Sequence, residues 1–224
     1  MGILSNNNND NREMSTNFYF PSFKKAIIIF TRNPELGQCK TRLAKTIGDT
    51  SALEIYKHLL KHTANVANIT NADKYVFYSE TIQDNDFWDA SIFRKKLQEG
   101  PDLGAKMQNA FSDIFSLGYQ KAIIIGSDLL DLKPIHIHLA FEALNENEFV
   151  IGPAKDGGYY LLGMHAMQDT IFKDKAWGTP SVLKETLKNL KDSTYHLLEE
   201  LNDIDTFEDM KHYQELEKYY IKND

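Results

Sequence analysis

Short apolar runs rich in β-branched residues recur along the chain. Four of them are KKAIIIFT (24–31), KYVFYS (74–79), KAIIIGS (121–127) and FVIG (149–152). Short continuous apolar runs are typical of strands that are buried on both faces of a parallel sheet. A further run, YYLLGMH, follows the pair Gly157–Gly158, a turn signal that favours a strand of antiparallel or mixed direction. The pattern therefore predicts a mixed sheet that is mostly parallel.

Helical periodicity fills most of the intervals between these runs. The predicted helices cover about residues 51–68, about 103–117, a segment after 134, a segment from about 180, and about 206–220. Ser51 with Glu54, and Thr206 with Asp209, have the spacing of capping boxes, and Pro180 suits a first helical turn. Alternating strands and helices with short links predict a three-layer α/β/α architecture.

The chain of 224 residues has the length of one α/β domain. Residues 22–224 contain no internal repeat and no linker rich in Pro, Gly or Ser, so we predict a single domain there. Residues 1–21 are rich in Asn and poor in apolar residues, which predicts a disordered segment.

Charge and hydropathy narrow the classes of function. The formal net charge of −7 argues against a general nucleic-acid binder, which needs a basic face, but allows one nucleotide in a locally basic pocket. No apolar run approaches the roughly 20 residues that span a bilayer, and the first residues lack the pattern of a signal peptide. A single cysteine, Cys39, excludes an internal disulfide and a Cys-rich zinc site. We therefore expect a cytoplasmic protein without a nucleic-acid or membrane partner.

A basic loop, TRNPELGQCKTRL, follows the first predicted strand. It has neither the Walker A spacing nor the Gly-x-Gly-x-x-Gly fingerprint. Gly37 nevertheless allows close backbone approach, and a helix expected from about Gln38 would offer free N–H groups to a phosphate beside Lys40 and Arg42. The alternative is a solvated loop whose cations serve only solubility.

Aspartates follow the later strands, where ligands of open α/β sheets collect. Asp128 follows IIIGS, Asp156 follows FVIGPAK, and Asp203 and Asp205 follow YHLLEEL. Carboxylates gathered at one edge repel one another unless a cation lies between them, and Mg²⁺ or Mn²⁺ takes carboxylates together with substrate phosphates. An isolated Asp-x-Asp pair is more often a cap of the following helix, so Asp203 and Asp205 have that alternative explanation.

Six motifs in order resemble one family. They are TRNPELGQCKTRL, GPDLGAKMQNAF, IIIGSDLLDL, IGPAKDGGYYLLGM, AWGTPSVL and NDIDTFEDM, which together extend from about Lys24 to Met210. The order resembles the DUF2064 group of glycosyltransferase-like proteins, which is similar to the phospholactate guanylyltransferases and the molybdenum-cofactor nucleotidyltransferases. The resemblance implies a GT-A-like nucleotide-diphospho-sugar transferase fold with a mixed, mostly parallel sheet.

The resemblance also implies a role for individual residues. Those expected to bind the nucleotide are Arg32, Gly37, Lys40, Arg42, Asp102, Leu103 and Gly104. Those expected to border the acceptor are Asp156, Gly157 and Gly158, with Trp177 as a further candidate, and Lys40 and Asp156 are the catalytic candidates. Asp128 would be the principal ligand of Mg²⁺ or Mn²⁺, with Asp203 and Asp205. The family often has Pro where this chain has Leu130, so the turn after Asp128 is expected to be less rigidly set.

Three hypotheses of function follow. The first is a metal-dependent glycosyltransferase that acts on an NDP-sugar and a small-molecule acceptor. The second is a nucleotidyltransferase that joins an NTP to a small phosphorylated acceptor and releases pyrophosphate. The third is a non-catalytic nucleotide-binding protein. The sequence does not indicate the base, the sugar, the acceptor or the oligomeric state.

Overall fold

A seven-stranded sheet forms the centre of the protein. The computed structural model describes residues 21–220, so the predicted disorder of the Asn-rich segment concerns residues outside the described ones, apart from Pro21. The strands are β1 (Lys25–Thr31), β2 (Asp73–Tyr78), β3 (Phe93–Leu97), β4 (Lys121–Ile125), β5 (Phe149–Pro153), β6 (Tyr159–Met164) and β7 (Tyr195–Leu197). Their order in the sheet is β3-β2-β1-β4-β6-β5-β7.

The direction of the strands confirms the predicted mixed sheet. β1 pairs in parallel with both β2 and β4, β2 pairs in parallel with β3, and β5 with β7. β6 is antiparallel to β4 and β5, as the glycine turn before it predicts. The chain leaves β1 toward β2 and β3 and then returns to place β4 on the other side of β1. The strand order therefore reverses between β1 and β4, which is where open α/β sheets bind ligands.

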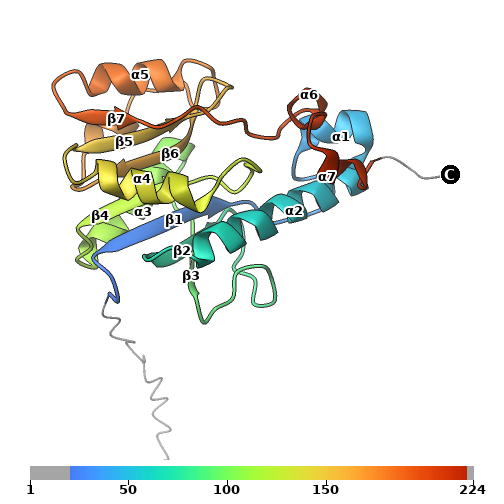
Figure 1. The fold of residues 1–224 in the computed structure, drawn as a ribbon, viewed down its shortest axis with the longest axis horizontal. Helices are drawn as coiled ribbons and strands as arrows, with labels where there is room; N and C mark the ends of the chain where they lie inside the picture. Colours follow the sequence, from blue (N-terminus) through green and yellow to red (C-terminus); the bar gives the residue numbers. More distant parts are fainter. Residues whose placement is uncertain (1–20, 221–224) are drawn as a thin grey trace, which may run out of the picture.

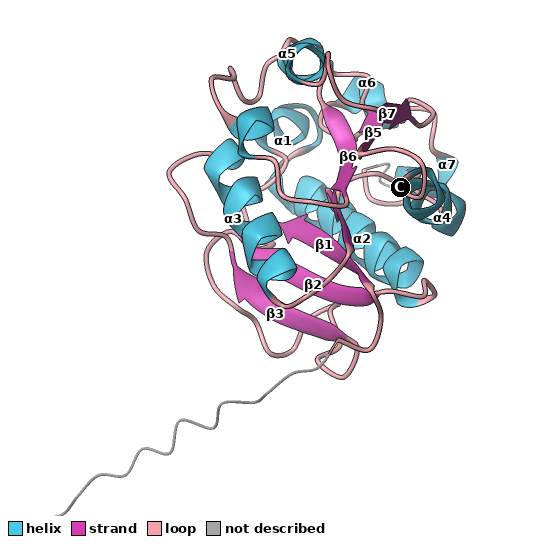
Figure 2. Ribbon diagram, turned by 90° about the vertical axis from the view of Figure 1, so that its left-hand side faces the viewer, coloured by secondary structure: helices cyan, strands magenta, loops and turns pink. Residues whose placement is uncertain are grey.

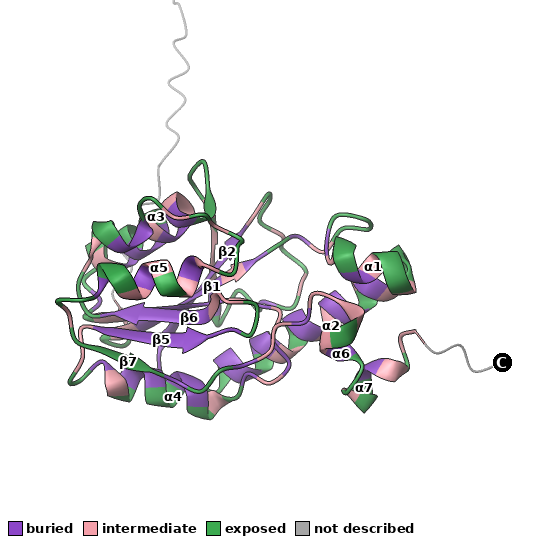
Figure 3. Cartoon of the chain, turned by 90° about the horizontal axis from the view of Figure 1, so that it is seen from above, coloured by how far each residue is buried: buried purple, intermediate pink, exposed green. Residues whose placement is uncertain are grey.

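Helices cover both faces of the sheet (Figures 1 and 2). The helical segments are α1 (Thr41–Ile47), α2 (Asp49–Asn68), α3 (Leu103–Ser116), α4 (Pro134–Ala143), the 3₁₀ segment η1 (Asp169–Phe172), α5 (Val182–Asn189), α6 (Phe207–Met210) and α7 (Gln214–Glu217). One apolar cluster joins α2 and α4 to the sheet, and a second joins α3, η1 and α5 to the opposite face. Figure 3 shows the buried strands between helices whose outer surfaces are exposed. The predicted three-layer α/β/α architecture is confirmed.

A third apolar cluster lies beyond the sheet, at the N-terminal end of α2. Figure 1 shows α1, α6 and α7 gathered there. Leu43 of α1, Ile55 of α2, Met210 of α6 and Leu216 of α7 are all fully buried in it. This cluster brings the loop after β1 and the segment before α6, which are far apart in sequence, to the same end of the molecule.

Several local predictions are corrected by the structure. α2 begins at Asp49 after Gly48, so Ser51 lies inside the helix and does not cap it. α5 begins at Val182 with Ser181 as its N-cap, which leaves Pro180 outside the first turn. The helix expected from about Gln38 begins at Thr41.

The expected final helix is two short helices. Tyr213 between them has an extended backbone, and its hydroxyl donates a hydrogen bond of 2.6 Å to Asp131. This distant contact holds the segment in a conformation that a continuous helix does not allow. The capping box of Thr206 and Asp209 is present as predicted.

Candidate functional site

Two adjoining hollows lie at the carboxyl ends of β1 and β4. The larger cavity has a volume of about 1050 Å³, and the smaller pocket about 280 Å³. Four residues line both: Phe30, Leu103, Gly126 and Asp128. Asp128 therefore stands at the junction of the two hollows, directly beyond the strand-order reversal.

The larger cavity is lined by charged side chains of both signs. Its cations are Arg32, Lys40, Arg42 and Lys106. Its carboxylates are Glu35, Glu80, Asp102, Asp128 and Asp205. The loop after β1 supplies most of the cations because it runs along the cavity from the end of the strand to the start of α1.

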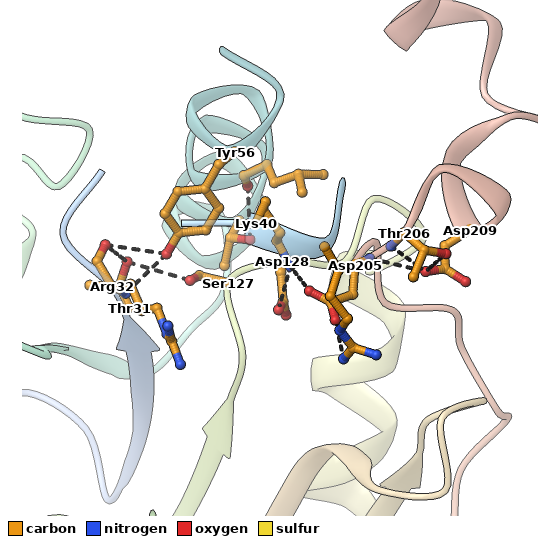
Figure 4. Close-up of polar contacts among 12 residues, drawn as sticks. Thr31, Arg32, Lys40, Tyr56, Ser127, Asp128, Asp205, Thr206 and Asp209 are labelled. Atoms are coloured by element: carbon orange, nitrogen blue, oxygen red, sulfur yellow. Dashed lines mark hydrogen bonds and ion pairs between the residues drawn. The ribbon is translucent and has the colours of Figure 1, made fainter. Parts of the chain in front are cut away.

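Lys40 lies at the centre of the ionic contacts (Figure 4). Its Nζ is 3.0 Å from Oδ2 of Asp128 and 3.9 Å from Oδ1 of Asp205, and its side chain is only 6% exposed. Burial by itself would lower the pKa of this ammonium, but the charge and hydrogen bond of Asp128, together with Asp205, hold the pKa above its ordinary value. Lys40 is therefore a charged group that two carboxylates keep in the cavity wall.

The backbone of Lys40 contributes to this position. Lys40 is the N-cap of α1 and has a left-handed conformation, with φ of 51°. Such a conformation costs a non-glycine residue about 1 kcal/mol or more. The two ion pairs offset part of that strain and hold the side chain toward Asp128. Arg42, two residues further along, forms an ion pair with Asp205 from a side chain that is 68% exposed.

Tyr56 of α2 lies beside Lys40 in the wall of the larger cavity. Its hydroxyl accepts a hydrogen bond of 2.9 Å from the backbone N–H of Arg32 and donates one of 3.2 Å to the carbonyl of Arg32. The Nζ of Lys40 lies 6.0 Å from the centre of the Tyr56 ring. Tyr56 thus fixes the chain where it leaves β1, before the loop crosses the cavity.

The segment 203–205 is held beside the loop after β4. The N–H of Ile204 donates a hydrogen bond of 3.1 Å to the carbonyl of Asp128. The Ile204 side chain is fully buried in the third apolar cluster, and Leu130 is buried in the same cluster at 8% exposure. Leu130 thus stabilises the turn after Asp128 by packing.

Asp203 and Asp205 project into different hollows. Asp205 lines the larger cavity and Asp203 lines the smaller pocket. Neither caps the following helix, because Thr206 and Asp209 form that cap. The capping explanation of the Asp-x-Asp pair is therefore wrong, and the pair instead presents a carboxylate on each side of Asp128.

The smaller pocket combines aromatic walls with carboxylates. Its rings come from Phe30, Tyr159, Tyr160 and Trp177, and its charged residues are Asp128, Asp156 and Asp203. Oδ1 of Asp156 accepts a hydrogen bond of 2.8 Å from the N–H of Gly158, which orients the carboxylate at the turn before β6. Burial, and then the negative charges of Asp156 and Asp128, raise the pKa of Asp203 to about 6.

The residues expected to hold a metal ion are neighbours but do not form a closed site. Within residues 21–220 no group of three or more His, Cys, Asp or Glu side chains is close enough together to hold a metal ion. Besides burial, the charges of Asp156 and Asp128 raise the pKa of Asp203, and a bound cation would relieve this repulsion between carboxylates. Magnesium commonly takes one or two carboxylates and completes its shell with water and substrate phosphates. Asp128 with either neighbour fits that requirement.

Residues 62–179, more than half of the chain, match the family model described as an uncharacterized protein conserved in bacteria, DUF2064. The chain belongs to the DUF2064 family. No curated protein matches it.

Solved structures are similar to this DUF2064 chain over most of its length. A protein of Desulfovibrio desulfuricans G20, provisionally assigned as a nucleotide-diphospho-sugar transferase, is 28% identical with a TM-score of 0.80 over 87% of this chain and 88% of that one. A cytidylyltransferase from Leptospira borgpetersenii is 13% identical, with a TM-score of 0.55 over 89% and 88% of the two chains. A glucosyl-3-phosphoglycerate synthase from Mycobacterium tuberculosis, solved with Mn²⁺ and UDP, is 9% identical, with a TM-score of 0.51 over 80% and 70%. These likenesses confirm the predicted fold class.

Most of the expected site residues of this DUF2064 protein line one of the two hollows. In the larger cavity are Arg32, Lys40, Arg42, Asp102 and Leu103. In the smaller pocket are Asp156, Gly158 and Trp177. Gly37, Gly104 and Gly157 line neither hollow. The roles expected for these residues stay predictions. Residues expected to bind the nucleotide line the larger cavity and those expected to border the acceptor line the smaller pocket, apart from the three glycines and from Leu103, which lines both.

Gly104 has a packing role that its sequence motif does not reveal. A Cβ atom at this position would lie 2.4 Å from Nε1 of Trp177 and 2.7 Å from the carbonyl of Phe172. The indole of Trp177 therefore lies against the backbone of α3, which brings it into the wall of the smaller pocket. Asp102, just before α3, accepts a hydrogen bond of 2.8 Å from the N–H of Ala105 and so caps the helix.

Several other residues that line the larger cavity were not predicted as site residues. They include Asn33, Tyr56, Ser79, Gln98, Lys106 and Ser127. Gln98 donates to the carbonyls of Thr31 and Phe77, so it joins the ends of β1 and β2. Lys106, one turn into α3, follows the motif GPDLG by two residues, and that spacing is the signal that could have found it.

Cys39 and the histidine pair of α2 have structural roles. The Cys39 thiol is buried at 3% exposure, and its burial raises the pKa despite the neighbouring Lys40 and Arg32, which favours a filler role. His62 Nε2 lies 2.8 Å from the carbonyl of Leu132, and His58 Nε2 lies 3.3 Å from Oε2 of Glu215.

Within residues 21–220 no helix is long and apolar enough to cross a bilayer.

Proposed function

We propose that this protein is a transferase that uses a nucleotide donor, and that it transfers a glycosyl group from an NDP-sugar to a small-molecule acceptor. One observation supports this most: a large cavity that contains four cationic side chains opens into a small aromatic and carboxylate-lined pocket at Asp128. A donor held in the larger cavity would direct its reacting carbon toward that junction. An acceptor in the smaller pocket would meet it there.

The cations of the larger cavity would bind the diphosphate. Asp128 and Asp205 hold Lys40 and Arg42 beside the cavity, where their positive charges would stabilise the negative charge that develops on the leaving group. Arg32 and Lys106 extend the cationic surface along the cavity. Asp102 and Leu103, at the start of α3, line the same cavity and would contact the base or ribose.

Asp156 would act on the acceptor. Its Oδ1 is oriented by the N–H of Gly158, and the carboxylate lines the smaller pocket. The acceptor hydroxyl oxygen would form a bond to the anomeric carbon while the bond from that carbon to the diphosphate breaks. Asp156 would accept the hydroxyl proton, and the NDP would leave with the electron pair.

A divalent cation is part of the proposal. Asp128, with Asp203 or Asp205, would hold Mg²⁺ or Mn²⁺ against the diphosphate. The ion would supply Lewis-acid stabilisation of the leaving phosphate oxygen. Asp128 would then exchange its ion pair with Lys40 for the metal, which would leave the Lys40 ammonium available to a phosphate oxygen.

Nucleotidyl transfer is the second candidate. It is favoured by the four cations of the larger cavity, because an NTP carries more negative charge than an NDP-sugar. Its acceptor phosphate would attack the α-phosphorus and release pyrophosphate. A third candidate, a nucleotide-binding protein without catalysis, predicts affinity for nucleotides but no turnover.

A donor panel tests the proposal. Melting temperatures would be measured with NTPs and NDP-sugars, with and without Mn²⁺, for the wild type and Asp128→Asn. A donor at about 100 times its Kd adds about 2.7 kcal/mol of stability, and we expect a shift that needs Mn²⁺ and is lost in Asp128→Asn. Asp113→Asn, at an exposed ion pair with Lys96 on the surface, is the matched control.

The released product separates the candidates. Turnover that yields NDP supports glycosyl transfer, and turnover that yields pyrophosphate supports nucleotidyl transfer. Donor binding without either product favours the non-catalytic candidate. If no nucleotide shifts the melting temperature of the wild type, the proposed donor class is wrong.

A further inference from the structure

The two hollows differ in the cations that line them: among the described residues, the larger cavity has charged side chains of both signs and the smaller pocket has carboxylates alone. Among the described residues, every Lys and Arg side chain of the combined site lines the larger cavity. The charged side chains of the smaller pocket are the carboxylates of Asp128, Asp156 and Asp203, and no described Lys, Arg or His lines it.

Most of the remaining lining of the smaller pocket is apolar or aromatic, and Thr179 adds a hydroxyl. Its wall includes Met107 and Val182 in addition to the four aromatic rings, and its volume of about 280 Å³ suits a small molecule. Trp177 forms part of this wall because its indole packs against Gly104. An aromatic wall opposite hydrogen-bond acceptors suits a hydroxylated ring or chain with an apolar face.

The geometry points to an acceptor whose bound part is uncharged or cationic, and excludes a phosphorylated or carboxylated group from the smaller pocket. This inference rests on the proposed function, since it assumes that the pocket holds the acceptor. An anionic group there would meet the carboxylates of Asp156 and Asp203, which no ion pair within residues 21–220 neutralises, whereas Lys40 already pairs with Asp128. The space is partly buried, where such repulsion is strong. A cation held by Asp128 and Asp203 would still leave Asp156 in the pocket.

The inference bears on the choice between the two enzymatic candidates. Nucleotidyl transfer to a phosphorylated acceptor needs cations around the attacking phosphate, whereas glycosyl transfer to a hydroxyl needs only a proton acceptor. The nearest lysine in sequence to Trp177 is Lys175, and its ammonium is hydrogen-bonded to Asn189 of α5. The charge of the pocket therefore favours a hydroxyl or amine acceptor, and with it glycosyl transfer.

Tryptophan quenching tests the charge of the pocket directly. The chain has two tryptophans, and Trp88 is buried at 2% exposure while Trp177 lines the pocket. We expect the ratio of caesium to iodide quenching of Trp177, with each ion measured relative to free N-acetyltryptophanamide, to lie about twofold to fivefold above one. That range corresponds to the free energy of partly exposed charge interactions. Neutral acrylamide normalises accessibility, and Trp177→Phe gives the contribution of Trp88.

Charge variants identify the source of the preference. Asp156→Asn and Asp203→Asn should each lower the ratio of caesium to iodide quenching. Asp192→Asn removes the same charge from an exposed surface position and should leave the ratio unchanged. A wild-type preference for iodide, or a caesium preference that neither pocket variant reduces, would overturn the inference.

A second arm separates this inference from the proposed function. A bacterial small-molecule extract would be divided on an anion exchanger, and each fraction tested as acceptor with the donor from the thermal panel. We expect turnover only with the unretained fraction, and turnover with the retained anionic fraction alone would overturn the inference. If neither fraction supports turnover, the proposed function fails, while the quenching ratio still decides the charge of the pocket.

Discussion

Lys40 is the residue on which the candidate site depends most. It is almost fully buried, has a strained backbone, and contacts carboxylates from two distant segments of the chain. In the proposed site Asp128 has two competing partners, since it either pairs with Lys40 or binds a metal ion. This competition leads to a prediction in which two affinities change in opposite directions.

We predict that Lys40→Met raises the affinity for Mn²⁺ alone and lowers the affinity for nucleotide. Methionine fills a similar volume without charge, so Asp128 and Asp205 lose their nearest cation and attract Mn²⁺ more strongly. The lost contact with phosphate should weaken nucleotide binding by about tenfold or more, as for a charged hydrogen bond. Titration calorimetry measures both affinities, with Lys45→Met on the same helix as control. A parallel change of the two affinities would contradict the competition.

At the scale of elements, packing outside the sheet positions the carboxylates. The segment 203–205 has no regular secondary structure. Its position depends on the burial of Ile204 in the cluster of α1, α2, α6 and α7, and on the hydrogen bond from Ile204 to Asp128. Asp203 and Asp205 flank this anchor, so loss of packing there should affect the site as well as stability.

We predict that Ile204→Ala lowers the free energy of unfolding by about 2–5 kcal/mol, the usual cost of a large apolar deletion, and also weakens nucleotide binding. Ile137→Ala on α4 removes an equally buried side chain from the cluster on the sheet and is the matched control. Denaturant unfolding and nucleotide titration measure the two effects. Equal losses of nucleotide affinity in the two variants would show that Ile204 has no special role at the site.

At the scale of the whole molecule, a chain of net charge −7 places four cations, together with five carboxylates, around one cavity. These cations differ in exposure, since the Lys40 side chain is 6% exposed and that of Arg42 is 68% exposed. Salt screens exposed charges much more than buried ones. The salt dependence of nucleotide binding should therefore come mainly from Arg42.

We predict that the wild type loses about fivefold in nucleotide affinity between about 0.1 and 1 M NaCl, as the Debye length falls from about 10 to about 3 Å and about 1 kcal/mol of exposed attraction is lost. Arg42→Gln should bind more weakly at low salt and show a flatter dependence. Lys191→Gln, another exposed cation, should behave as the wild type. An unchanged salt slope in Arg42→Gln would contradict the assignment of Arg42 to the phosphates.

The sequence by itself determined the central strands, because residues buried on both faces must be apolar. KAIIIFT and KAIII are parallel strands as predicted, and the structure shows that they are neighbours in the sheet. The polar residues that follow them share one edge of the sheet. β3, with the sequence FRKKL, was not predicted, because it has no apolar run. A strand at the edge of the sheet tolerates such charged residues. β7 (Tyr195–Leu197) lies within YHLLEEL, the run that the sequence placed before Asp203, although all three of its residues are exposed.

Only the tertiary structure decided how the charged groups are paired and divided between two hollows. Lys40 and Asp128 are 88 positions apart, and Tyr213 interrupts the last helix through a contact with Asp131 that is 82 positions away. Local spacing carries no information on such contacts, because they form only when packing brings distant segments together. The sequence therefore predicted the edge of the sheet where the site lies. The fold decided that Lys40 lies between two carboxylates and that the smaller pocket is acidic.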